Sequence, residues 1–183
     1  RFQIRHSIYK EDMHAIPQKG PTVVIANHPF GGIDGVLLAS ILCTIRSDVK
    51  ILANYFLDRI PEMRPLLFNV DPFGNKTAIH KNRTALKQAV RWVRGGGLLM
   101  VFPAGEVSHF NWKSKKIEDP NWEEAVVRII RWTHAKVVPV YFKGRNSLSF
   151  HAAGVIHPLL RTLMLPREML KKQSVHIHLK IGS

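Results

Sequence analysis

Cysteine is almost absent from this sequence, since Cys43 is the only one in 183 residues. A lone cysteine excludes an intrachain disulfide, and its apolar neighbours fit a reducing compartment or the cytoplasmic side of a membrane. Long hydrophobic runs are missing as well. The longest candidate, residues 35–45, is interrupted by Ser40 and Thr44 and falls short of the about 18 residues that a spanning helix needs. We therefore expect no membrane-spanning segment in this stretch of chain.

Acidic residues are also scarce. Aspartate and glutamate number 13 against 27 lysines and arginines, which gives a formal net charge of +14. Such an excess favours polyanionic partners, namely nucleic acid, an anionic membrane surface or an acidic carrier protein. The sequence shows no recognition helix and no RNA-binding signature, so nucleic acid is not the expected partner.

Length and composition predict one globular domain over residues 1–183. Hydrophobic residues make up 45% of the chain and charged residues 22%, which excludes wholesale disorder. The chain is long enough for one core and short for two. It begins at Arg1 and not at methionine, which is compatible with a fragment of a longer protein.

Strand-like and helix-like patterns alternate along most of the chain. We expect strands at residues 22–26, 49–53, 66–70, 98–102, 137–142 and 174–181. We expect helices at residues 33–45, at 81–94 and from a cap at Asp119 and Pro120 to about residue 133. Pro139 predicts that its strand lies at a sheet edge or beside a bulge. The alternation predicts an α/β fold with a mostly parallel central sheet flanked by helices.

Two loops that follow predicted strands carry residues able to do chemistry. In the first loop, His28 is followed by Gly31, Gly32 and Asp34. A histidine can take a proton from an alcohol, and a carboxylate on its other ring nitrogen fixes the tautomer and stabilises the imidazolium. The glycines make it sterically feasible for the turn to bring Asp34 back to His28. From these residues alone, a helix-capping aspartate beside an ordinary loop histidine is equally compatible.

The two loops and a later strand together resemble the lysophosphatidate acyltransferase (PlsC-type) superfamily, whose members move a fatty acyl group from a thioester to a lipid or glycerophosphate hydroxyl. Asn27, His28 and Asp34 match its first block, an Asn-His pair, a spacer and an Asp. The segment FPAGEVS at residues 102–108 is similar to its Phe-Pro-Glu-Gly-Thr-Arg-Ser block, and VVPV at 137–140 to its apolar strand with an internal proline. The resemblance covers most of residues 16–145 and implies a PlsC-type acyltransferase fold.

The sequence departs from the family pattern in three places. Five residues separate His28 from Asp34 where the family usually has four, and the paired glycines offer the means to absorb the extra one. The third block lacks its glutamate and arginine and has Glu106 one place after the glycine. The second block, LLFNVDPFGNK, lacks the arginine that helps to hold the acceptor's phosphate, so Lys76, Lys81 or Arg83 would have to replace it. These departures weaken the case for a glycerol phosphate acceptor.

The segments HPFGGIDG and FPAGEVS resemble more specifically the hemolysin-like branch, which includes acyltransferases that make ornithine lipids. A lyso-ornithine lipid carries a carboxylate and an amine in place of a phosphate. The resemblance implies O-acylation of a lysophospholipid or lyso-ornithine lipid, with acyl-carrier protein or acyl-coenzyme A as the donor and no further cofactor. It also implies a peripheral enzyme at the cytoplasmic face of a bacterial inner membrane.

The mechanism that the resemblance implies is direct attack, with His28 as the general base and Asp34 as its orienting partner. The chain contains no Gly-x-Ser-x-Gly, so we do not expect an acyl-enzyme. Backbone N–H groups at the glycines are candidates to stabilise the oxyanion, and Glu106 is a candidate to bind the acceptor's amine or a surface carboxylate without a role. The residues predicted to bind substrate are Asn27, Gly31, Gly32, Lys76, Arg83, Phe102, Pro103, Gly105, Glu106 and Ser108.

Two alternative functions remain open at this stage. A hydrolase that admits water in place of the acceptor would use the same His28 and Asp34, and a basic nucleic-acid-binding domain would need only the charge. His176 and His178 share a strand face, but a third metal ligand is not apparent, so no metal site is predicted. Aromatic and basic residues interleave in the predicted loop at residues 109–118, which suits either an anionic lipid surface or ordinary solvent.

Overall fold

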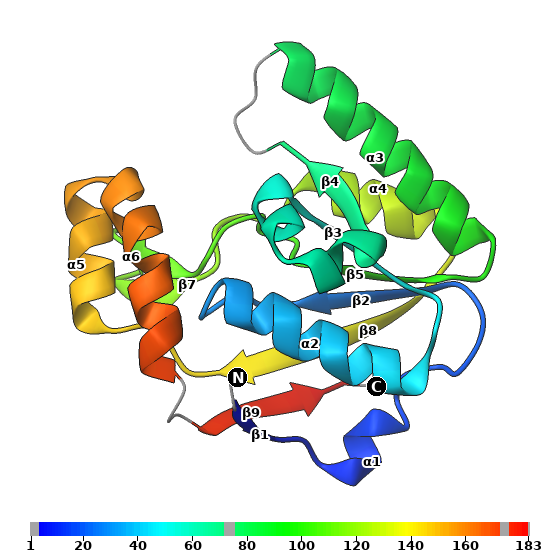
Figure 1. Cartoon of the computed structure of the whole chain (residues 1–183), viewed down its shortest axis with the longest axis horizontal. Coiled ribbons are helices and arrows are strands. Elements are labelled where there is room, and N and C mark those ends of the chain that lie inside the picture. The colour runs from blue at the N-terminus through cyan, green and yellow to red at the C-terminus, as the bar shows by residue number, and fades with distance from the viewer. Residues whose placement is uncertain (1–3, 72–75, 173–175, 183) are drawn as a thin grey trace.

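The computed structural model describes residues 4–71, 76–172 and 176–182, with the backbone alone at residues 10, 11, 55, 56, 76–79 and 81. In this part of the chain, seven strands form one sheet in the order β1-β9-β8-β2-β5-β3-β4 (Figure 1). The strands are β1 (Arg5–Ser7), β2 (Thr22–Ala26), β3 (Val49–Asn54), β4 (Leu67–Val70), β5 (Leu98–Val101), β8 (Lys136–Lys143) and β9 (His176–Ile181). Neighbouring strands are parallel except for β8 and β9. The predicted mostly parallel α/β sheet is confirmed.

Helices and a small hairpin surround the sheet. The α-helices are α1 (Lys10–Met13), α2 (Gly32–Ile45), α3 (Lys76–Arg94), α4 (Glu124–Thr133), α5 (Leu148–Ile156) and α6 (Pro158–Lys171). Two 3-10 helices, η1 (Tyr55–Arg59) and η2 (Pro61–Leu66), connect β3 to β4. A separate antiparallel hairpin consists of β6 (His109–Asn111) and β7 (Lys116–Glu118).

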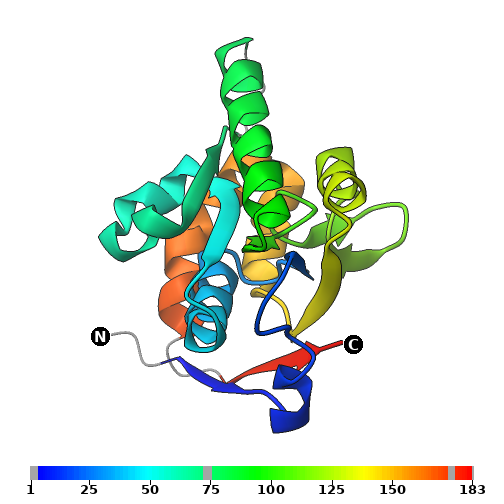
Figure 2. The same ribbon diagram turned by 90° about the vertical axis from the view of Figure 1, so that its right-hand side faces the viewer.

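The core has two halves because the central strands are apolar on both faces. In β2, Val24 points into a cluster with α2, and Val23 points into a cluster with α3 and α4. Alternate residues of a strand face opposite sides, so a run of β-branched residues such as TVVIA can fill both halves. Figure 2 shows the resulting three layers, with α2 on one side of the sheet and α3 and α4 on the other.

The helical hairpin of α5 and α6 lies outside these layers. Figure 1 shows the two helices side by side beyond the end of β2 from which α2 begins. Glu168 ties them together, since its buried carboxylate accepts hydrogen bonds from Ser147 N (2.9 Å) and Ser147 Oγ (2.6 Å) at the start of α5. The sequence pattern did not predict this hairpin, which stands at the carboxyl ends of the parallel strands.

Three local predictions were wrong. The helix predicted to start after Asp119 begins at Glu124, and residues 109–118 form the hairpin β6–β7 and not only a loop. The strand with Pro139 is neither at an edge nor at a recorded bulge, because β8 lies between β2 and β9. The last predicted strand is observed from His176 onward, and residues 174 and 175 lie outside the described residues.

Pro139 is tolerated inside the sheet because of where β9 ends. The paired residues of β8 and β9 run from Lys143 and His178 to Val140 and Ile181, so the pairing ends next to Pro139. Pro139 contributes its carbonyl oxygen, which accepts from Gly182 N at 2.8 Å. A proline lacks only the N–H, so it fits at a point where the facing ladder has ended.

Arg46 at the end of α2 anchors the opposite edge of the fold. Its buried guanidinium donates to both carboxylate oxygens of Asp48 (2.7 and 2.6 Å) and to the carbonyl oxygens of Gly20 (2.9 Å) and Gly96 (2.6 Å). The hydrogen bonds from Arg46 hold the pKa of Asp48 below its ordinary value. We expect Arg46→Met to lower the free energy of unfolding by about 3 kcal/mol, because it removes several charge-assisted hydrogen bonds at once. Urea denaturation measures this loss.

Arg128 provides the matched control for Arg46. It forms a single exposed ion pair with Glu124 at 2.7 Å within α4. Exposed pairs of this kind contribute less than about 1 kcal/mol, so Arg128→Met should leave the urea midpoint almost unchanged. Equal effects of the two substitutions would contradict the anchoring role of Arg46.

Candidate active site

The candidate site begins in the loop that connects β2 to α2. Asn27, the first residue after β2, is held by β8, since its Nδ2 donates to Phe142 O (3.0 Å) and its Oδ1 accepts from Phe142 N (2.7 Å). Both ends of this amide are engaged with backbone. Asn27 therefore fixes the direction in which the chain leaves the sheet, and His28 is positioned by that anchor.

His28 and Asp34 meet across the turn. His28 Nδ1 lies 3.1 Å from Asp34 Oδ2, and the carboxylate is fully buried while 17% of the His28 side chain is exposed. The two atoms are close enough for an ion pair but off the direction of an ideal hydrogen bond. Catalytic hydrogen bonds in enzymes without substrate are often poorly aligned and tighten in the reacting complex. This arrangement leaves the other ring nitrogen, Nε2, to face an acceptor.

The same carboxylate also starts the helix. Asp34 Oδ2 accepts from Phe30 N (2.8 Å) and Gly31 N (3.1 Å), as the third residue of α2 does in a capping box. The helix-capping interpretation and the catalytic one are thus both compatible with Asp34. A single carboxylate is fixed by two backbone donors and presented to the imidazole.

Gly31, and not Gly32, has the unusual backbone conformation in the turn between His28 and Asp34. It adopts φ of 83°, in the left-handed region that other residues avoid, whereas Gly32 is already the first residue of α2. A Cβ on Gly31 would also meet Leu165 Cδ2 at 3.0 Å and Val107 Cγ2 at 3.3 Å. Of the two glycines, Gly31 makes the turn. Its conformation favours a glycine, and its surroundings leave a side chain little room.

Burial controls the acidity of Asp34. Removal from water raises the pKa of Asp34 above its ordinary value, because a carboxylate loses solvation in the core. The neighbouring His28 and the two backbone donors, Phe30 N and Gly31 N, oppose this rise without cancelling it.

The loop after β5 braces the histidine from the other side. The ring of Phe102 stacks on the imidazole of His28 with centroids 4.1 Å apart. Ser108 N donates to His28 O at 2.9 Å, and Asp119 accepts both from His28 N (3.2 Å) and from Ser108 Oγ. Asp119 was expected only as a helix cap and is a positioning residue that the sequence missed. It lies 91 residues from His28 in the chain, so no local pattern could have revealed it.

The rest of this loop is held by backbone contacts. Gly105 takes φ of 67° and donates its N–H to Phe102 O at 3.0 Å, and Pro103 O accepts from Glu123 N at 2.8 Å. Glu106 is more exposed than its neighbours, yet its carboxylate pairs with Arg161 of α6 at 2.9 Å. Of the residues predicted in this loop, Phe102 and Ser108 contact His28, whereas Pro103, Gly105 and Glu106 bond to other residues.

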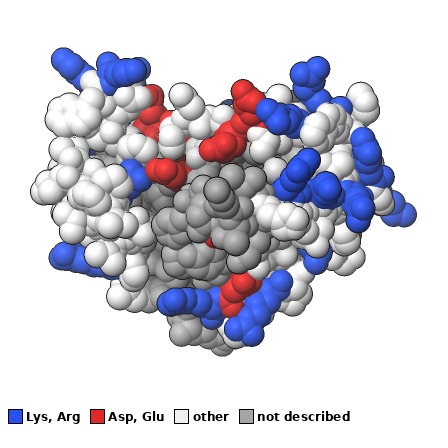
Figure 3. Space-filling view, turned by 90° about the horizontal axis from the view of Figure 1, so that it is seen from above, with Lys and Arg blue, Asp and Glu red and all other residues white. Residues whose placement is uncertain are grey.

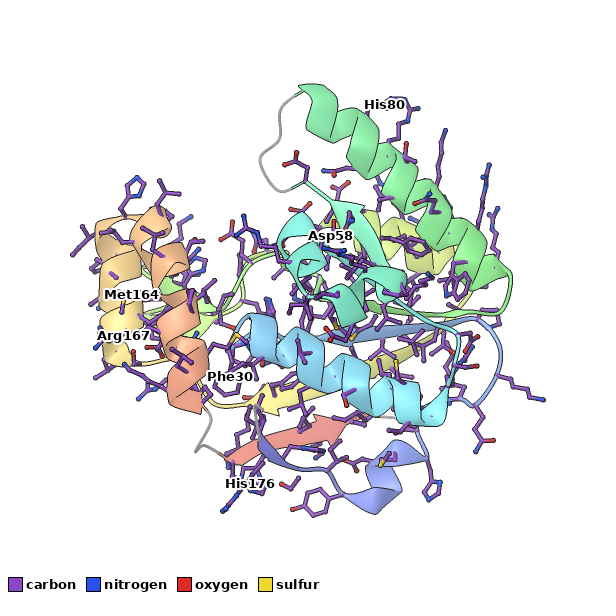
Figure 4. All side chains as sticks on the ribbon, in the orientation of Figure 1. Phe30, Asp58, His80, Met164, Arg167 and His176 are labelled. Atoms are coloured by element: carbon purple, nitrogen blue, oxygen red, sulfur yellow. The ribbon has the colours of Figure 1, made fainter. Side chains whose placement is uncertain are left out.

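Of the three predicted phosphate contacts, only Arg83 has a side chain that the structure describes. The side chains of Lys76 and Lys81 lie outside the described residues. Arg83 is exposed on α3, whose His80 is labelled in Figure 4 well away from Phe30 beside α6. The structure therefore does not bring Arg83 to the His28 loop.

The residue that follows α6, Lys172, is a cation that the sequence did not predict. Lys172 Nζ lies 4.8 Å from the centre of the Phe30 ring and donates to Arg145 O at 3.1 Å. Burial lowers the pKa of Lys172, although the charges of Glu168 and Asp34 oppose that shift. Lys172 therefore lies close enough to the buried Asp34 to share its electrostatic field. No pattern near Lys172 in the sequence marks it for this place.

The described residues place limits on other site types. No helix among them is long and apolar enough to cross a membrane. Nor do three or more histidine, cysteine, aspartate or glutamate side chains within the described ranges gather closely enough to hold a metal ion.

Comparison with known proteins bears directly on these motifs. The model of the family described as "Acyltransferase" matches residues 4–183. The chain belongs to the acyltransferase family. This acyltransferase chain is 30% identical over 174 residues to a lyso-glycine lipid O-acyltransferase of Phocaeicola vulgatus and 31% identical over 139 residues to one of Bacteroides thetaiotaomicron. Those alignments cover 91% and 74% of the chain but 60% and 48% of the relatives, so the chain spans about half the length of the curated relatives it matches.

A solved structure supports the fold independently. The 1-acyl-sn-glycerophosphate (LPA) acyltransferase PlsC from Thermotoga maritima superposes with a TM-score of 0.53, covering 98% of this chain and 60% of that one. Sequence identity over the match is 18%, so the likeness concerns the fold alone. The predicted family and the predicted PlsC-type fold are both confirmed.

Proposed function

We propose that this member of the acyltransferase family transfers a fatty acyl group to the hydroxyl of a lyso-lipid, and that the acceptor is a lyso-glycine lipid or a close analogue. The names of the two relatives support the reaction and the acceptor. The observation that carries the proposal is the 3.1 Å contact between His28 Nδ1 and the buried Asp34 Oδ2. A histidine oriented in this way is suited to take a proton from an alcohol.

The proposed reaction is a direct displacement at the thioester carbonyl. His28 Nε2 takes the hydroxyl proton while the hydroxyl oxygen bonds to the acyl carbon and forms a tetrahedral oxyanion. Collapse of this intermediate breaks the C–S bond, and the leaving thiolate takes the proton from His28. Asp34 holds the Nδ1 proton and stabilises the imidazolium between these two transfers.

The oxyanion requires backbone donors, and most of the predicted ones are engaged. Gly31 N donates to Asp34, and Gly105 N donates to Phe102 O. Gly32 is the first residue of α2. The N–H groups at a helix start have no partner within the helix and form the positive end of the helix dipole. We assign the oxyanion to the start of α2, with Gly32 N–H as its first donor.

The outer surface supports action at an anionic bilayer. Several large aliphatic side chains of α5 and α6 are between 42% and 77% exposed. Such a group is larger than the single apolar residues that are common on protein surfaces. The side chains in this group are Leu148, Val155, Ile156, Leu159, Leu160, Leu163 and Leu170. Figure 3 shows that the side of the molecule with these helices is mostly uncharged, while lysine and arginine gather on the opposite side. The exposed aliphatic side chains support peripheral binding to a membrane surface through α5 and α6, and the net charge of +14 favours an anionic one such as the cytoplasmic face of an inner membrane.

Donor and acceptor are tested together with a labelled acyl thioester. The protein is incubated with labelled acyl-carrier protein or acyl-coenzyme A and, in separate reactions, lyso-glycine lipid, lyso-ornithine lipid, lysophosphatidate or no acceptor. We expect the label in the acylated glycine lipid. Label recovered only as free fatty acid would establish the hydrolase alternative, and efficient acylation of lysophosphatidate alone would contradict the proposed acceptor.

A further inference from the structure

A second polar site lies next to the candidate active site. A pocket of about 280 Å³ lies where the hairpin β6–β7 meets α5 and α6, and Glu106, Trp112, His151 and Arg161 are among its lining residues. Its size is at the lower end of the range of ligand pockets and suits a small headgroup better than a fatty acyl chain. The sequence assigned no function to His151 or Arg161.

The polar groups of this pocket are buried and incompletely paired. His151 is 6% exposed, and neither of its ring nitrogens has a hydrogen-bond partner among the described residues. Arg161 is 9% exposed and donates from Nη2 to Glu106 Oε2 at 2.9 Å, a single contact for a group with five N–H donors. Buried polar groups are normally hydrogen-bonded, so these side chains have donors to spare for a ligand.

The charge of the pocket indicates what kind of ligand fits. Arg161 and Glu106 neutralise one another, and burial lowers the pKa of His151, which keeps its imidazole neutral with one N–H to donate. The pocket can therefore offer guanidinium and imidazole N–H groups to a single negative charge. A phosphate with two charges would meet the Glu106 carboxylate with less compensation.

The pocket is one helical turn from a residue that packs on the turn between His28 and Asp34. Arg161 and Leu165 are four residues apart on α6 and thus lie on the same face, about 6 Å from one another along the helix axis. Leu165 and Val107 pack on Gly31, in the turn between His28 and Asp34. Glu106 directly precedes Val107, so both walls of the pocket continue into the turn that holds the catalytic pair.

We propose that this pocket binds the carboxylate of the acceptor's amino-acid headgroup, through Arg161 and the N–H of His151. Glu106 holds the Arg161 guanidinium in place while the pocket is empty. When the acceptor binds, its carboxylate takes hydrogen bonds from the other N–H groups of Arg161. The inference rests on the proposed lyso-lipid acceptor, and it adds the residues that would recognise the headgroup of that acceptor. Glycine joined to a fatty acid through its nitrogen keeps a free carboxylate, whereas a methyl ester of the same lipid does not.

Calorimetric titration tests this assignment without requiring turnover. The probes are N-octanoylglycine, its methyl ester and octyl phosphate. We expect the wild type to bind the free acid at least tenfold more tightly than the ester, since a hydrogen-bonded charge pair is typically worth a tenfold to hundredfold change in Kd. We expect Arg161→Gln to bring the acid-to-ester ratio close to one.

Two further variants separate ligand binding from structural support. Arg128→Gln removes an arginine that likewise has one glutamate partner, Glu124, and should keep the wild-type ratio. Glu106→Gln breaks the same ion pair as Arg161→Gln but leaves the guanidinium, so it should keep or raise the preference for the acid. If Glu106→Gln and Arg161→Gln lower the ratio equally, the pair is only a structural tie and the proposal is overturned.

The remaining outcomes are also decisive. Should Arg161→Gln fail to fold, His151→Phe tests the same site and should lower affinity for the acid severalfold with little change for the ester. An unchanged ratio in a folded Arg161→Gln or His151→Phe protein would refute the site, as would tighter binding of octyl phosphate than of the acid. Acid selectivity in a protein that fails to acylate any lyso-lipid would refute the proposed function and leave the pocket assignment standing.

Discussion

Replacing His28 by alanine is expected to lower kcat for acyl transfer about 10³-fold, because general base catalysis contributes about 10²- to 10⁴-fold. This corresponds to about 4 kcal/mol of lost transition-state stabilisation. The substitution also removes the stack on Phe102, so the free energy of unfolding should fall by only about 1 kcal/mol. Steady-state assays with labelled donor, together with urea denaturation, measure both quantities.

A histidine away from the site provides the control. His176 is exposed on β9, and His176→Ala should leave both kcat and stability close to wild type. A His28→Ala protein that is folded and retains more than a tenth of the wild-type kcat would rule out His28 as the base.

The second large effect is a loss of activity without a loss of stability. We expect Asp34→Asn to lower kcat about a hundredfold or more, because an amide cannot stabilise the imidazolium or hold the tautomer that His28 needs. The amide oxygen can still accept from Phe30 N and Gly31 N, so the start of α2 is preserved. The thermal midpoint at pH 7 should therefore equal or exceed that of the wild type.

The sign of the pH dependence follows from burial. Because the folded protein holds the pKa of Asp34 above its ordinary value of 3.8, the native state binds this proton more tightly than the unfolded state. The stability associated with Asp34 is fully present below 3.8 and is lost as the pH rises through the raised native pKa. Any advantage of Asp34→Asn over wild type should thus be present at pH 7 and disappear as the pH is lowered toward 4. A midpoint at pH 7 well below wild type would show that the charge of Asp34 stabilises the fold.

The sequence predicts best where one local pattern decides the structure. The run TVVIA has no charged residue and is mostly β-branched, and β2 is observed over the residues predicted. The Asn-His, spacer and Asp pattern likewise predicts a close contact because a short turn leaves few ways to place two side chains. Gly31 was identified jointly with Gly32, and the structure separates them by their φ angles.

Prediction fails where distant segments determine the role of a residue. Asp119 followed by proline has the local form of a helix start. In the structure, its carboxylate instead accepts a hydrogen bond from the backbone of His28, 91 residues away. Helices α5 and α6 escaped prediction because most of their large aliphatic side chains stay exposed, so a clear buried stripe is absent, and because Pro166 interrupts the helical signal. The same exposure that hides these helices from pattern analysis is what suits them to a bilayer.

Arg161 and His151 illustrate the same limit within the site. Neither lies in a family motif. Both become part of a pocket only when α5 and α6 are folded next to Glu106. An arginine on an amphipathic helix is ordinary in sequence. Burial with unused donors is a property of the folded protein alone.

A double-mutant cycle tests the central claim most directly, namely that Asp34 acts on the acceptor only through His28. The rate of acyl transfer is measured in wild type, His28→Ala, Asp34→Asn and the double variant. If the pair is one catalytic unit, Asp34→Asn should cost about a hundredfold in the wild type and almost nothing in the His28→Ala background. Losses that multiply in the double variant would contradict this account.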